Sequence, residues 1–123
     1  MDLPLATPRL RLRPFRPADA PAFAAYRSDP RVAEYQGWDA PYPLERAQAF
    51  IDAMLASQPG QPGEWFQLAI ELRAGGDLLG DCAFKLLTQD PRQAEIGMTL
   101  AAGAQGQGYA LEAGTCLLDA LFR

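Results

Sequence analysis

A glycine-rich stretch near the C-terminus is the part of this sequence best suited to bind a ligand through its backbone. Residues 101–118 read AAGAQGQGYALEAGTCLL. Five positions carry small residues: Gly103, Ala104, Gly106, Gly108 and Ala110. A helical pattern follows, and the first amides of a helix have no partner within the helix while the helix dipole makes that end positive. The stretch therefore predicts a site for a phosphate or pyrophosphate on these amides.

Two other phosphate-binding patterns fit this loop less well. A Walker loop ends in Gly-Lys-Ser or Gly-Lys-Thr, whereas this loop ends in Gly108-Tyr109-Ala110. A dinucleotide fingerprint needs G-x-G-x-x-G inside a βαβ unit, and here a short turn joins the preceding strand to the strand before it. A turn without a ligand stays open as an alternative, because a single G-x-G before a helix is a weak signal.

The composition excludes several other kinds of site. The chain has 123 residues, 11 Lys and Arg against 15 Asp and Glu, two cysteines and no histidine. Without histidine, Ser-His-Asp and Cys-His nucleophiles and ordinary zinc sites are excluded, so we expect no metal. The net charge of −4 argues against binding to nucleic acid. No apolar run could span a membrane and no signal-peptide pattern is visible, so we expect a cytoplasmic protein with no membrane partner.

The elements that would position the loop form a mixed α/β pattern. Strands are expected at 9–15, 64–73, 78–87 and 93–101, and helices at 17–28, 43–58 and 109–122. The order is β-α-α-β-β-β-α, and short turns join the later strands. This pattern predicts an α/β (α+β mixed) fold with a mostly antiparallel sheet.

The first expected strand alternates arginine with leucine. Arg9, Arg11 and Arg13 would share one face, and Leu10 and Leu12 the other. The arginine face could bind phosphate, but a solvated face on an edge strand is the interpretation we favour.

The glycine-rich loop resembles a known cofactor motif. The run from Gln105 to Ala110, QGQGYA, fits Gln/Arg-x-x-Gly-x-Gly/Ala, the acyl-CoA pyrophosphate motif of GNAT-superfamily N-acetyltransferases. Residues 94–100 followed by 105–113 are similar to the ribosomal-protein alanine acetyltransferase (RimJ/RimL-like) branch, as are residues 7–13 and 29–32. The resemblance covers essentially the whole chain. It implies the GNAT fold, with acetyl-CoA as co-substrate.

The resemblance also implies roles for backbone groups. The pyrophosphate would lie on a set of six residues: Gln105, Gly106, Gln107, Gly108, Tyr109 and Ala110. The strand before the loop would splay from its neighbour, so that Met98, Thr99 and Leu100 pair with the pantetheine arm. An amide of Met98 or Thr99 would polarise the thioester carbonyl.

Side-chain roles are less determined by the sequence. Glu95 is the candidate general base, directly or through water. The alternative is a structural glutamate, either on the solvent side of the strand or paired with Arg92 or Lys85. Asp81 is a weaker second candidate. Three aromatic residues, Tyr35, Trp38 and Tyr42, lie between the first two helices, a region that lines the acceptor pocket in the proteins this chain resembles. Tyr35 and Trp38 are therefore candidates to line that pocket, with core packing as the open alternative, and for Tyr42 we favour core packing.

The expected reaction is N-acetylation of a primary amine, on a protein N-terminus or a small molecule, by direct attack in a ternary complex. Relatives continue with a further strand, an asparagine-bearing helix and a tyrosine. We therefore expect residues 1–123 to be a single acyl-CoA N-acyltransferase domain that is incomplete at its C-terminus, with the general acid beyond Arg123. The alternatives are a non-catalytic acyl-CoA- or nucleotide-binding regulatory module and a purely structural domain. An unpaired sheet edge would also allow a homodimer.

Overall fold

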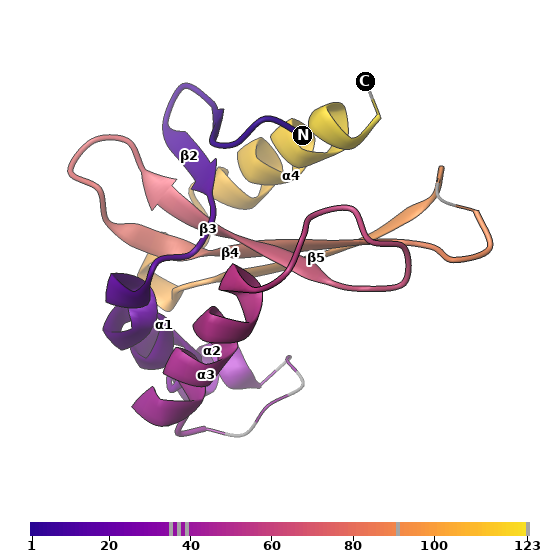
Figure 1. Cartoon of the computed structure of the whole chain (residues 1–123). Coiled ribbons are helices and arrows are strands. Elements are labelled where there is room, and N and C mark those ends of the chain that lie inside the picture. Colours follow the sequence, from indigo (N-terminus) through magenta and orange to yellow (C-terminus); the bar gives the residue numbers. More distant parts are fainter. Residues whose placement is uncertain (35, 37, 39, 91, 123) are drawn as a thin grey trace.

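An antiparallel sheet forms the middle of the molecule, with helices on both of its faces (Figure 1). The computed structural model describes residues 1–122 except 35, 37, 39 and 91. Within these residues the sheet has five strands in the order β1-β2-β3-β4-β5, and every neighbouring pair is antiparallel. The predicted mixed α/β fold with its antiparallel sheet is confirmed.

The elements lie close to where the sequence patterns predict them. The strands are β1 (Leu5–Ala6), β2 (Leu10–Arg13), β3 (Phe66–Leu72), β4 (Leu78–Leu86) and β5 (Ala94–Leu100). The helices are α1 (Ala20–Arg27), α2 (Pro30–Ala33), α3 (Leu44–Leu55) and α4 (Tyr109–Leu121), with short 3-10 turns η1 (Pro17–Asp19) and η2 (Ala102–Ala104). The sequence patterns did not predict β1 or α2. Across the described residues, the helices lack the length and apolar character needed to cross a bilayer.

The sheet separates two apolar cores, because successive side chains of a strand point to opposite faces. On one face, Leu68 of β3 and Cys82 of β4 pack with Leu117 of α4. On the other face, Ala69 of β3 packs with Phe23 of α1. Figure 1 shows α4 alone on its side of the sheet and α1, α2 and α3 gathered on the opposite side. The glycine-rich loop leads from the end of β5 to the side on which α4 lies.

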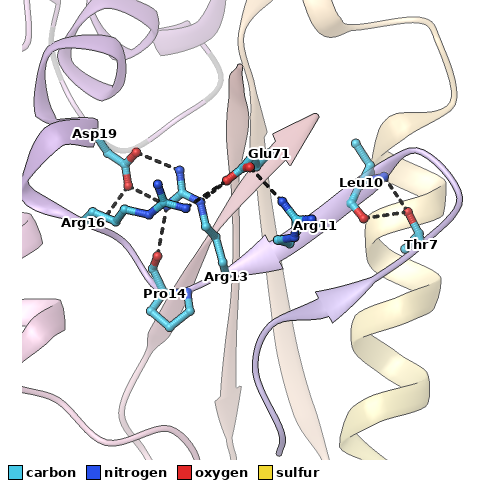
Figure 2. Close-up of polar contacts among 8 residues, drawn as sticks. All are labelled: Thr7, Leu10, Arg11, Arg13, Pro14, Arg16, Asp19 and Glu71. Atoms are coloured by element: carbon cyan, nitrogen blue, oxygen red, sulfur yellow. Dashed lines mark hydrogen bonds and ion pairs between the residues drawn. The ribbon is translucent and has the colours of Figure 1, made fainter. Parts of the chain in front are cut away.

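The arginines of β2 take part in a buried ion cluster (Figure 2). The guanidinium of Arg13 donates to both carboxylate oxygens of Asp19, at 2.8 and 2.9 Å, and to Glu71. Arg11 and Arg16 also reach Glu71, at 3.0 and 3.3 Å, from more exposed positions. Arg13 itself is only 6% exposed. The interpretation as a solvated face on an edge strand is therefore wrong for Arg13, whereas the side chain of Arg11 is 39% exposed.

The outer edge of β2 is covered because β1 pairs with it. Leu5 lies opposite Leu12, and Ala6 lies opposite Arg11. β1 is two residues long, which is too short for an alternating pattern to predict it. Because Arg13 is buried, its charge must find partners within the protein.

Helix α2 begins at Pro30, two residues after the expected end of the preceding helix at residue 28. The Asp29 side chain accepts a hydrogen bond from the amide of Arg31 at 2.9 Å and so caps the helix. Pro30 occupies the first helical position, where a backbone N–H has no partner within the helix. The same Asp-Pro pair thus ends one helix and starts another.

Candidate active site

Helix α4 presents its first amides at the end of the glycine-rich loop. Gly108 is the N-cap residue, with a left-handed φ of 83°, and Gly106 has a φ of 78°. The amide of Glu112 already bonds to the carbonyl of Gly108, at 3.1 Å, so the amides before it have no such acceptor within the helix. Both glycines are needed for backbone conformation, because other residues rarely adopt a positive φ. The arrangement is that of an anion site at a helix N-terminus.

Arg9 holds this loop against the start of β2. Its guanidinium donates to the carbonyl of Gln107 at 3.0 Å, lies 4.4 Å from the centre of the Tyr109 ring, and pairs with Glu112 at 2.7 Å. A hydrogen bond from Thr7, with further bonds from Arg9, lowers the pKa of Glu112, which favours the ionised form of this paired carboxylate. Arg9 therefore places a cation beside the loop. The sequence pattern did not predict this contact between Arg9 and the loop.

The backbone groups of β5 alternate between its partner strand and an open edge. β5 pairs with β4 along its whole length, and the next amide, of Ala101, donates to the carbonyl of Leu79 at 2.8 Å. In an antiparallel ladder every second residue bonds to the neighbouring strand. The amides and carbonyls of Ile96, Met98 and Leu100 therefore point away from β4. The separation of β5 from a neighbour that the resemblance implies is absent on the β4 side.

The loop folds back onto this open edge. The side chain of Gln105 donates to the carbonyl of Leu100 at 3.1 Å, and that of Gln107 donates to the carbonyl of Gly103 at 2.9 Å. The β5 edge and the start of α4 thus border one cavity of about 320 Å³. Its lining comprises Arg31, Val32, Gln36, Met98, Thr99, Leu100, Gln105 and Ala110. Helix α2 supplies the wall that faces β5.

A second cavity, of about 520 Å³, lies on the same side of the sheet as α1. Its lining comprises Arg27, Gln36, Trp38, Trp65, Gln67, Asp81, Ala83, Gly97, Met98 and Thr99. The two cavities share Gln36, Met98 and Thr99. Molecules held in the two cavities would therefore meet beside Met98 and Thr99.

Asp81 is a buried carboxylate in the wall of the second cavity. It is 2% exposed, accepts a hydrogen bond from the hydroxyl of Tyr26, and accepts others from Gln67 at 2.9 Å and Arg27 at 3.4 Å. Burial raises the pKa of Asp81, and the charge of Arg27 and the hydrogen bonds offset this only in part. Burial also raises the pKa of Tyr26, and the neighbouring Asp81 charge adds to that effect. The site thus holds an acid whose proton affinity is raised.

Arg27 lies against aromatic rings at one side of the same cavity. Its guanidinium carbon lies 4.0 Å from the centre of the Trp38 ring and 4.4 Å from that of Phe23. The indole N–H of Trp38 donates to the carbonyl of Arg27 at 2.8 Å, which fixes the ring against helix α1. In the part of the chain that the structure describes, Arg27 Nε is the one buried side-chain nitrogen or oxygen with no hydrogen-bond partner.

The residues expected to contact the acceptor lie in different environments. Trp38 lines the second cavity, and Tyr42 is 4% exposed within the core, so the preference for core packing at Tyr42 is confirmed. Tyr35 lies outside the described residues. Glu95 is exposed and pairs with Lys85 at 3.7 Å, which is the alternative left open above. Among the described residues, Glu95 is not part of the lining of either cavity.

Comparisons with known proteins agree with this architecture. Residues 9–123 match the family described as "Acetyltransferase (GNAT) domain". An uncharacterised N-acetyltransferase, p20, of Bacillus licheniformis is 30% identical over 115 residues, which is 94% of this chain and 64% of that protein. The chain thus spans about two-thirds of the length of this curated relative.

Solved structures share the fold. An acetyltransferase of the GNAT family from Bacillus anthracis superposes with a TM-score of 0.80 at 23% identity, over 95% of this chain and 64% of that chain. RimJ of Mycobacterium smegmatis, solved in complex with CoA-disulfide, superposes with a TM-score of 0.73 at 24% identity, over 92% of this chain and 56% of that chain.

Proposed function

The chain belongs to the GNAT acetyltransferase family, and from this premise we propose that it binds acetyl-CoA and transfers the acetyl group to a primary amine. The amine would attack the thioester directly while both substrates are bound. The cytoplasmic location expected from the sequence is part of this proposal.

The pyrophosphate of CoA would lie on the amides between Gln105 and Ala110. Three observations support this placement: the left-handed Gly106 and Gly108, the unbonded first amides of α4, and the Arg9 cation beside the loop. Backbone amides and the positive end of a helix favour a phosphate without help from side chains. The RimJ structure that shares this fold was solved in complex with CoA-disulfide, a derivative of the same cofactor.

The pantetheine arm would pair with the open edge of β5. The alternation of the ladder favours Met98 and Leu100 as the residues whose amides and carbonyls are available, whereas the amide of Thr99 faces β4. The sequence left the choice between Met98 and Thr99 open, and we now assign the Met98 amide to the thioester oxygen. Thr99 would contribute through its place in both cavity walls.

The acceptor amine would enter through the second cavity, beside Trp38. Its nitrogen attacks the thioester carbon, the oxygen gains negative charge next to the Met98 amide, and the thiolate leaves. Holding the two reactants in adjacent cavities lowers the barrier, by about 7–11 kcal/mol where alignment is good. A base role for Glu95 would require water between its exposed carboxylate and the amine.

The observation that carries the proposal is the junction of the two cavities at Met98 and Thr99. The test is a panel of amines and N-terminal peptides with acetyl-CoA, carried out on the whole polypeptide that contains these residues. We expect release of free thiol with at least one acceptor, and CoA alone should raise the unfolding temperature. Protection by CoA without thiol release from any acceptor would contradict the catalytic role.

A matched pair of variants separates the two halves of the site. Gly97 and Ala83 face each other on the wall of the second cavity, where a larger side chain would fill space. We expect Ala83→Leu to raise KM for the amine while leaving protection by CoA unchanged. Gly106→Val should instead reduce protection by CoA and leave KM for the amine unchanged, because valine does not tolerate the φ of 78° at this position.

A further inference from the structure

The second cavity contains a carboxylate placed to take a proton. We propose that Asp81 is the group that removes the proton from the acceptor ammonium, in the reaction proposed above. The assignment rests on the proposed function, because it requires an amine in this cavity. It goes beyond that function in naming a residue and an atom.

The hydrogen bonds around Asp81 leave room for one more donor. Oδ1 accepts from Gln67 and from Arg27, whereas Oδ2 accepts from the hydroxyl of Tyr26. A carboxylate offers about four lone-pair positions, two on each oxygen. Oδ2 therefore keeps one position for the N–H of a ligand, in a side chain that lines the cavity.

The position along the sheet also suits this role. Asp81 lies directly opposite Thr99 in the β4–β5 ladder, and both side chains belong to the wall of the second cavity. Residues bonded in this way in an antiparallel pair have Cα atoms about 5.5 Å apart. An amine against Asp81 is thus one strand away from the Met98–Thr99 segment to which we assign the thioester.

Polar and charged groups from three elements face the Asp81 carboxylate. Tyr26 and Arg27 approach from α1, Gln67 from β3 and Thr99 from β5. Farther along the same face lie two ion pairs, Lys85–Glu95 and Arg13–Glu71. Burial raises the pKa of Asp81, which brings its proton affinity closer to the range useful for a base near neutral pH.

The unpartnered nitrogen of Arg27 is independent evidence for a polar ligand. Arg27 is 7% exposed and lines the cavity, and its Nε has no hydrogen-bond partner in the described structure. Buried polar groups are nearly always hydrogen-bonded, so an unpaired buried donor that lines a cavity has room for an acceptor on a bound molecule. By contrast, Arg13 meets two carboxylates and does not line this cavity.

The step is balanced in atoms and charge. An N–H bond of the ammonium breaks, the electron pair stays on nitrogen, and Asp81 becomes a neutral acid. The free amine then attacks the thioester carbon, and the carbon–sulfur bond breaks as the amide forms. The second proton of the nitrogen leaves with the thiolate as the thiol of CoA. Asp81 returns its proton to solvent when the cavity empties.

The test uses Asp81→Asn and Tyr26→Phe in the whole polypeptide, with Asp52→Asn, an exposed change on α3, as the matched control. We expect Asp81→Asn to lower kcat by about 10²–10⁴-fold while affinity for CoA is unchanged. Tyr26→Phe removes a hydrogen bond that lowers the pKa of Asp81, so the acidic limb of the pH profile should move to higher pH. Circular dichroism and the unfolding temperature check that each variant folds.

The outcomes distinguish this assignment from the function on which it rests. A folded Asp81→Asn protein with the wild-type rate, or a Tyr26→Phe profile that does not move, would overturn the role of Asp81 alone. A wild-type protein that shows neither binding of CoA nor release of thiol would overturn both. If Asp81→Asn does not fold, the pH profile of Tyr26→Phe decides, because a merely structural hydrogen bond would not shift it.

Discussion

Two buried ion clusters lie on the same face of the sheet and differ in how fully their polar groups are paired. Around Arg13, the cation meets Asp19 and Glu71 at close range. Around Asp81, the cation of Arg27 stacks on aromatic rings, reaches the carboxylate at 3.4 Å, and leaves its Nε without a partner in the described structure. The second cluster lines a cavity shared with Trp38. Complete pairing indicates a structural role, and incomplete pairing beside a cavity indicates a binding role.

The pKa values of the carboxylates shift in opposite directions in the two clusters. The hydrogen bond from Arg13 is the main cause of the lowered pKa of Glu71. Burial alone would raise the pKa of Asp19, but bonds from Arg13 and Arg16 lower it. At Asp81 burial prevails, and its pKa is raised. Ionisation therefore favours folding in the first cluster and opposes it in the second.

The largest effect on stability should come from Arg13→Ala. This change leaves the buried carboxylates of Asp19 and Glu71 without their main cation. Breaking one side of a buried ion pair costs about 3–5 kcal/mol, and we expect that loss in the free energy of unfolding measured with urea. A loss comparable to that from an exposed arginine would show that the Arg13 cluster does not support the fold.

A smaller loss of folding stability is expected from Gly80→Ala. This change would act on the second cluster by displacing the backbone of β4 and β5. A Cβ at Gly80 would overlap the carbonyl oxygen of Thr99, so β4 and β5 would have to separate beside Asp81. We expect about 1–3 kcal/mol of destabilisation by urea unfolding. Gly103→Ala is the control, because an added Cβ there meets nothing and its φ is not positive. Equal stability of the two variants would contradict the close approach of the strands.

The opposite pKa shifts should appear as opposite pH slopes of stability. For Glu71, whose pKa is lowered by folding, the advantage of wild type over Glu71→Gln should grow as pH rises from about 3 to about 5. For Asp81, whose pKa is raised, the advantage over Asp81→Asn should decline as pH rises above about 4. Urea unfolding at a series of pH values gives both slopes. Slopes of the same sign would remove the distinction between the clusters.

The smallest effect should come from Arg11→Ala, at the rim of the first cluster. Its side chain is 39% exposed and pairs with Glu71, which keeps Arg13 as a partner. Exposed pairs contribute about 0–1 kcal/mol. We expect a shift in the urea midpoint near the limit of measurement. A loss as large as that of Arg13→Ala would mean that the cluster depends on the number of charges rather than on burial.

Much of the fold was predictable because it rests on local patterns. The later strands, helix α3 and helix α4 follow apolar periodicity, and their boundaries differ from expectation by a few residues. Two short elements were missed for local reasons. β1 has too few residues to form a pattern. α2 is four residues long and begins just after the expected end of the helix at 17–28, where Asp29 caps a new helix.

The two parts of the candidate site also differ in how far the sequence predicts them. The loop between Gln105 and Ala110 was recognisable in the sequence because its residues are consecutive. Its glycines lie directly before the helix that they lead into, where the structure has them at positive φ. The cluster at Asp81 was not visible as a unit, because Tyr26 and Gln67 lie 55 and 14 residues away along the chain. Tertiary packing joins them, and no sequence spacing records it.

The central claim, that backbone amides of the β5 edge and of the first turn of α4 bind CoA, is tested most directly by amide hydrogen exchange. The whole polypeptide would be compared with and without saturating CoA. We expect slower exchange in peptides that cover residues 96–100 and 105–112, and unchanged exchange around the Arg13–Glu71 cluster. Unaltered exchange of both peptides, with CoA shown to be bound, would contradict the claim.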